Sequence, residues 1–117
     1  MGPRSPGAAP DASAIVVRGA DLSGNLLDGL RTRIPTMRVS TRSGECPQIM
    51  FRGPRSVRYQ GNPSVYLDGT LTIDTCVLTS IAASDVDYVE VYTSGNVSRP
   101  GIQGNAFGMI FIHRLRQ

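Results

Sequence analysis

The chain has 117 residues, of which 40% are hydrophobic and 18% charged, and its formal net charge is +3. This length suits a single domain, and this composition is typical of a folded globular protein rather than of a disordered chain. No apolar run approaches the roughly 20 residues that a membrane-spanning helix needs, which excludes a transmembrane helix.

The chain begins with a segment of unusual composition. Residues 1–14, MGPRSPGAAPDASA, contain proline, glycine, alanine and serine without apolar periodicity, which predicts an extended or disordered tail. They also lack the basic and apolar regions of a signal peptide, so an exported form would have lost its leader or would use another route. Residues 15–17 (IVV) then predict a short strand, and we expect one domain over 15–117.

The next segment has helical periodicity. Asp21 and Ser23 are both candidate N-caps, because their side-chain oxygens accept hydrogen bonds from unpaired amides of a first turn. The apolar residues recur at helical spacing and predict a buried stripe: Leu26, Leu27, Leu30 and Ile34. Pro35 ends the helix, since the residue before a proline is driven towards extended geometry.

Short strands are predicted over the rest of the chain. Five segments have the apolar or alternating pattern of strands: 36–41, 47–52, 64–73, 88–92 and 107–113. Asp68-Gly69 divides the third into a hairpin, because this pair tolerates positive φ. Residues 107–113 are almost all apolar, which favours a central strand covered on both faces. Residues 84–87 (SDVD) fit a capping box for one helical turn. We therefore predict an α+β fold, a small mixed sheet with one or two short helices.

Five segments in this order resemble the plug domain of TonB-dependent outer-membrane receptors. The family's short helix and first strand correspond to residues 26–39 (LLDGLRTRIPTMRV), and its I-x-I-R-G strand to residues 49–53 (IMFRG). The P-L-Y-V-V-D-G strand corresponds to residues 63–69 (PSVYLDG). The last two motifs correspond to residues 81–91 (IAASDVDYVEV) and 103–112 (QGNAFGMIFI). The resemblance covers about three-quarters of the chain and implies a plug-like fold.

The resemblance also sets expectations about individual residues and about what this chain lacks. Turn and fold positions are expected at Pro35, Gly53, Asp68, Gly69 and Gly108. Receptors of this family continue for several hundred residues as a β-barrel, whereas this sequence stops at 117, so we expect no transport gating of its own. Residues 15–17 lie where receptors often carry the strand offered to TonB, but an edge strand is the favoured interpretation.

Charge is unevenly distributed along the chain. All basic residues are arginine, and residues 31–58 hold seven of them against Glu45, a balance of +6, whereas residues 59–98 hold five acids and no base, a balance of −5. The arginines either pair with acids and solvate strand faces, or they bind a partner. The hypothetical partner-binding set is Arg4, Arg31, Arg33, Arg38, Arg42, Arg52, Arg55 and Arg58. Nucleic acid is an unfavoured partner, because stacking aromatics are not interleaved with these arginines.

Residues that carry chemistry are few. Cys46 and Cys76 are too few for a metal site when His113 is the only histidine, and they either form a disulfide across about 30 residues or stay reduced. His113 continues an apolar strand, so a strand-end position is favoured over a general base. No phosphate-binding glycine motif is present. We therefore expect no catalytic, cofactor-binding or metal-binding residues.

These observations lead to one leading function and two alternatives. The leading hypothesis is a non-catalytic, plug-fold subunit, periplasmic and peripheral to a membrane, that binds and braces a larger assembly of the bacterial cell envelope. Its contacts with protein partners would come from the tail and the arginine-rich surface. The first alternative is the excised plug of a receptor whose barrel is missing. The second is a domain that binds a small molecule in a polar-lined pocket.

Overall fold

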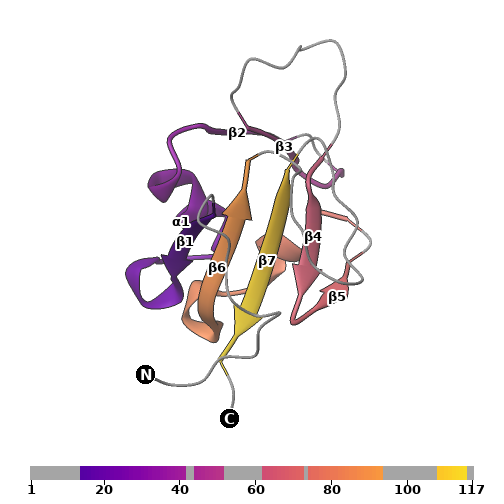
Figure 1. Cartoon of the computed structure of the whole chain (residues 1–117). Coiled ribbons are helices and arrows are strands. Elements are labelled where there is room, and N and C mark those ends of the chain that lie inside the picture. Colours follow the sequence, from indigo (N-terminus) through magenta and orange to yellow (C-terminus); the bar gives the residue numbers. More distant parts are fainter. Residues whose placement is uncertain (1–13, 42–43, 52–61, 73, 94–107, 116–117) are drawn as a thin grey trace.

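A computed structural model describes residues 14–41, 44–51, 62–72, 74–93 and 108–115 (Figure 1). The elements in chain order are β1 (Ile15–Arg18), η2 (Gly19–Asp21), α1 (Leu26–Arg33), β2 (Met37–Ser40), β3 (Gln48–Phe51), β4 (Ser64–Leu67), β5 (Thr70–Leu71), α2 (Val77–Ser80), η3 (Ala83–Asp85), β6 (Val86–Tyr92) and β7 (Met109–Arg114). Neither α-helix in these ranges has the length and apolarity needed to cross a membrane. The α+β class is confirmed.

A five-stranded sheet forms the centre of the molecule, in the order β1-β6-β7-β4-β5. β4 and β7 run parallel, and the other pairs run antiparallel, so the sheet is mixed. β7 is the middle strand and its first four residues are buried, which confirms the prediction from its continuous apolar run. Among the described strands β1 pairs only with β6, so residues 15–17 form an edge strand as favoured.

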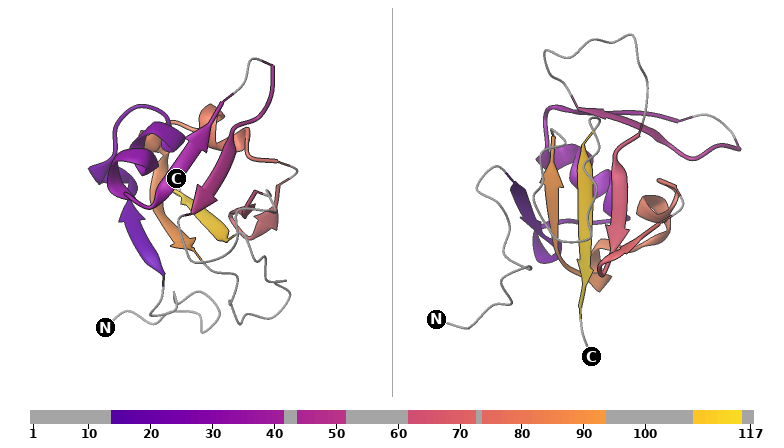
Figure 2. Two further views of the ribbon diagram at one scale, coloured as in Figure 1. Left: turned by 90° about the horizontal axis from the view of Figure 1, so that it is seen from above. Right: turned by 45° about the vertical axis from the view of Figure 1, so that its right-hand side comes forward.

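A separate two-stranded sheet, β2–β3, crosses one end of the central sheet (Figure 2). Its side chains alternate as the sequence predicts: Met37 and Ile49 are buried, whereas Arg38 and Met50 on the other face are exposed. Successive side chains of a strand point to opposite faces, so one face of this hairpin covers the core and the other faces solvent.

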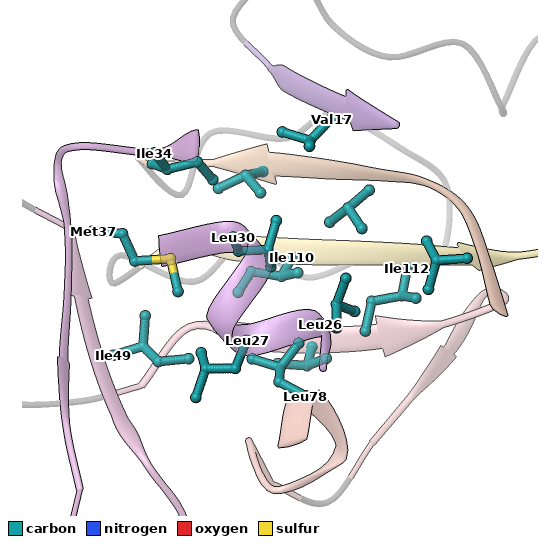
Figure 3. Close-up of a cluster of buried hydrophobic side chains, with 14 residues drawn as sticks. Val17, Leu26, Leu27, Leu30, Ile34, Met37, Ile49, Leu78, Ile110 and Ile112 are labelled. Carbon is teal, nitrogen blue, oxygen red and sulfur yellow. The ribbon is translucent and has the colours of Figure 1, made fainter. Parts of the chain in front are cut away.

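The main core lies between α1 and one face of the central sheet (Figure 3). The four predicted stripe residues of the helix are each at most 3% exposed. They pack in one cluster with Val89 and Val91 of β6, Ile110 and Ile112 of β7, and Leu78 of α2. Burial of each such side chain contributes roughly 1.5–3 kcal/mol, so this stripe is what attaches the helix to the sheet.

Two predicted local details are wrong. α1 is capped by Asn25, whose Oδ1 accepts a hydrogen bond from Asp28 N–H at 2.8 Å, and not by Asp21 or Ser23. Asn25 can cap the helix because, like Asp and Ser, it has a side-chain oxygen that accepts a hydrogen bond from an unpaired amide. It also forms a β-bridge with Ala82, which fixes where the helix begins. Asp21 lies instead in the short turn η2.

The segment 84–87 is not a capping box. The helical turn η3 starts at Ala83, one residue earlier, and has no side-chain cap. Val86 already pairs with Arg114 of β7, so the rest of the predicted box, including Asp87, belongs to β6. Pairing with a strand from the far end of the chain overrides the local signal here.

The predicted hairpin at residues 64–73 is confirmed as β4 and β5. Asp68 has φ 50° and Gly69 has φ 89°, the left-handed geometry that such a tight turn requires. Gly108 has φ 108°, and a Cβ there would lie 2.8 Å from the ring of Phe51. A side chain at this position would be strained and would also separate β7 from β3.

Candidate docking surface and polar sites

Two of the predicted partner-binding arginines lie in the last turn of α1. Because the apolar stripe of the helix faces the core, Arg31 and Arg33 point outward, and each side chain is about half exposed, at 52% and 51%. Each approaches one acid, Asp28 or Asp21, at 3.9 Å. Exposed ion pairs of this length contribute little, roughly 0–1 kcal/mol, so both guanidinium groups remain available to a partner.

A third arginine stands on the neighbouring hairpin. Arg38 is exposed on the outer face of β2, directly across from Met50 of β3, which is 39% exposed. The described residues supply no acid that pairs with Arg38. We refer to Arg31, Arg33, Arg38 and Met50 as the arginine surface. Arg4, Arg42, Arg52, Arg55 and Arg58, like Gly53, lie outside the described residues.

The hairpin that carries Arg38 is held to the start of α2 by a disulfide. Cys46 and Cys76, which are 30 residues apart in sequence, are bonded with their Cα atoms 4.8 Å apart. Next to it, the buried hydroxyl of Thr75 donates a hydrogen bond to the carbonyl of Pro47. These links join the start of β3 to the start of α2, so the hairpin cannot swing away without breaking a covalent bond.

One group of potential metal ligands surrounds this disulfide. The ligand atoms of Cys46, Asp74 and Cys76 lie within 4.8 Å of one another. The two sulfurs are bonded to each other, and Asp74 Oδ1 already accepts a hydrogen bond from Cys76 N–H at 3.0 Å. Metals bind thiolates rather than disulfide sulfurs, so this set acts as a structural link.

A buried acid lies on the face of the sheet opposite α1. Glu90 has no solvent exposure, its Oε2 lies 2.6 Å from His113 Nε2, and its Oε1 accepts a hydrogen bond from Tyr92 at 3.0 Å. The ring of His113 stacks on Tyr88 with centroids 4.3 Å apart. A buried carboxylate is tolerated only when it is paired and hydrogen-bonded, and this one is.

This cluster was not predicted from the sequence. Alternation along β6 puts Glu90 on the same face as Tyr88 and Tyr92, but which residue of another strand meets it depends on strand pairing. His113 lies near the strand end, as favoured, and its ring is oriented by an acid as in a catalytic dyad. A dyad also needs a nucleophile, and none of the described hydroxyl or thiol groups hydrogen-bonds to His113. Within the described part of the chain, the pair joins β6 to β7.

An ion pair lies at the same end of β7, one residue beyond His113. Asp68, in the turn after β4, accepts hydrogen bonds from the backbone N–H of Arg114 at 2.9 Å and from its Nε at 2.7 Å. The backbone hydrogen bond foremost, and the guanidinium as well, hold the pKa of Asp68 below its ordinary value of 3.8. The turn residue thus fixes the end of the central strand.

No protein-family model matches the sequence, and neither does any curated protein. Solved structures do match. The RagAB peptide importer in its closed-closed state is 23% identical with a TM-score of 0.63, and the alignment covers 92% of this chain and 13% of that one. The copper transporter OprC is 19% identical with a TM-score of 0.60, covering 90% of this chain and 16% of that one.

These solved proteins are TonB-dependent receptors, and the likeness shows that this chain has a plug-domain-like fold. The resemblance that five short motifs indicated is therefore confirmed at the level of the fold. The chain spans less than a fifth of the length of either solved chain. The activities of those transporters belong to much longer chains.

Proposed function

We propose that this chain is a non-catalytic binding module, a plug-fold subunit that braces a larger membrane-associated assembly of the bacterial cell envelope. It binds a protein partner from the periplasmic side, through the arginine surface and the N-terminal segment 1–14. The observation that carries the proposal is the exposure of Arg31, Arg33 and Arg38 on two adjoining elements, α1 and β2. Among the described residues, the acids near Arg31 and Arg33 form only long, exposed ion pairs with them.

The platform beneath these arginines supports the same function. The last turn of α1 is anchored by Leu30 and Ile34, neither of which has any solvent exposure, and the hairpin is anchored by its disulfide. A surface that is rigid before binding loses less conformational entropy when the partner arrives. The disulfide also agrees with a periplasmic location, because that compartment is oxidising.

The proposal is tested by co-purification from the native membrane in mild detergent. The triple variant R31E/R33E/R38E should lose its partner while keeping its melting temperature, because all three side chains lie outside the core. R18E is the charge-reversal control, since Arg18 is an exposed arginine of the edge strand β1 and is not part of the arginine surface. Equal recovery of the partner with the triple variant and with R18E would contradict the proposal.

The N-terminal segment gives a second, independent test. Deletion of residues 1–14 should weaken co-purification and leave the domain folded, because β1 begins at Ile15. A truncated chain that recovers the partner in full would remove the segment from the proposed interface.

One observation favours the alternative that this chain is the plug of a longer receptor. The solved chains that share the fold contain it as 13–16% of their length. Sequencing the full gene decides the matter: several hundred further codons with a two-residue hydrophobic alternation would indicate a receptor.

A further inference from the structure

The hydrogen bonds around the β2–β3 hairpin show which way its backbone groups point. Met37 N–H donates to the carbonyl of Ile34 at 3.0 Å, so it faces away from β3. Backbone groups alternate in direction along a strand of an antiparallel pair, so the N–H and C=O of Val39 also face away from β3. Ile49, the cross-strand partner of Val39, agrees with this register, because its N–H points away from β2 to Asn62 Oδ1 at 2.8 Å.

The two edges of the hairpin therefore differ. The β3 edge is occupied at Ile49 by the side chain of Asn62, next to the start of β4. On the β2 edge, no described group hydrogen-bonds to the outward N–H or C=O of Val39. An open strand edge of this kind is a template for a further strand.

The charge beside the open edge restricts what would pair with it. Arg38 directly precedes Val39 in the chain, and its side chain is on the exposed face of β2. Arg31 and Arg33 lie in the helix turn that precedes this strand. Edge strands that carry unneutralised cations resist pairing with a copy of themselves, because like charges would face each other. The same cations favour an extended segment with acidic side chains.

We propose that the β2 edge receives an acidic, extended segment of the partner protein as a third strand of the β2–β3 sheet. The N–H and C=O of Val39 hydrogen-bond to the incoming backbone, and the arginine surface pairs with its carboxylates. Main-chain bonds supply affinity in this mode of recognition, and side chains supply selectivity. The assignment rests on the proposed function and names its partner chemistry.

The experiment uses the full chain and a synthetic peptide of about ten residues in which threonine and glutamate alternate. V39P and V39A form a matched pair, because both lose the same half-buried packing and only V39P loses the outward N–H. Proline is accepted at an edge position whose N–H is not used within the sheet. We expect V39A to bind the peptide like the wild type and V39P to bind about tenfold more weakly, the effect of one lost hydrogen bond.

A second measurement does not depend on the variants. Amide hydrogen exchange of Val39 in the wild-type protein should slow when the glutamate peptide saturates it, and the matching threonine–lysine peptide should bind more weakly. Unchanged exchange at Val39, equal binding by V39P and V39A, or equal binding of the two peptides would each overturn the assignment. Loss of co-purification in the R31E/R33E/R38E variant together with equal peptide binding by V39P and V39A would retain the proposed function and refute strand addition.

Discussion

Removal of the disulfide tests how much of the stability depends on the link between the β2–β3 hairpin and the start of α2. Cys46 and Cys76 close a loop of 30 residues, and both are half-buried. For a loop of this length the chain-entropy relation gives about 12 cal/mol/K, or about 3.6 kcal/mol at 25 °C. A domain of this size has a total stability of about 5–15 kcal/mol, so the loss is a large fraction of it.

The assay is equilibrium unfolding in urea, followed by far-ultraviolet circular dichroism because the chain contains no tryptophan. We expect C46S/C76S to unfold at about 2 M less urea than the wild type, given a denaturant slope near 1.5 kcal/mol/M. Wild-type protein kept in a strong reductant is the control, and its urea midpoint should equal that of the double variant. A midpoint shift under about 0.5 M would refute the reasoning, since the cross-link would then not restrict the unfolded chain.

Three further predictions concern the sheet. G19A should lower stability by about 3 kcal/mol or prevent folding, because a Cβ at Gly19 would overlap the backbone of β6; thermal unfolding measures this, and an unchanged melting temperature contradicts it. H113L should lower the free energy of unfolding by about 3 kcal/mol at pH 7, because it leaves Glu90 buried without its nearest partner. An unchanged urea midpoint would mean that the other contacts of Glu90 are enough to stabilise it. The pKa of Asp68 is lowered in the folded state, so its contribution is present above its ordinary value of 3.8 and is lost as pH falls through the folded pKa. The free energy of unfolding of the wild type should therefore fall more than that of D68N between about pH 5 and pH 2. The difference should be under about 1 kcal/mol, because the side chain is well exposed. Parallel profiles of unfolding free energy against pH would contradict this.

Several elements follow from local sequence alone. The stripe of α1 was predicted because helical spacing by itself brings its four apolar residues onto one face, whatever they later contact. The β4–β5 turn follows from Asp68 and Gly69, since positive φ is a property of the residues themselves. The middle position of β7 follows from its uninterrupted apolar run, which only a strand covered on both faces can bury.

Part of the candidate site was also predictable from local sequence, and part was not. Alternation along 36–41 placed Arg38 outward, and helical spacing placed Arg31 and Arg33 outward, so three of the proposed contacts were predictable. The direction of the Val39 N–H was not, because it depends on which edge of β2 faces β3 and on where Met37 and Ile49 find their hydrogen-bond partners. Edge availability is a property of the pairing rather than of the strand.

The sequence by itself therefore determined the buried stripe of α1, the inward and outward faces of the β2–β3 hairpin, the Asp68-Gly69 turn and the plug-like order of elements. Tertiary structure alone decided that Glu90 meets His113, that Cys46 reaches Cys76, that Asn25 begins the helix, and that β6 starts at Val86. The physical reason is the distance along the chain over which each effect acts. Periodicity and turn chemistry act within a few residues, whereas each of the other results joins groups that lie together only when strands distant in sequence pair in one register.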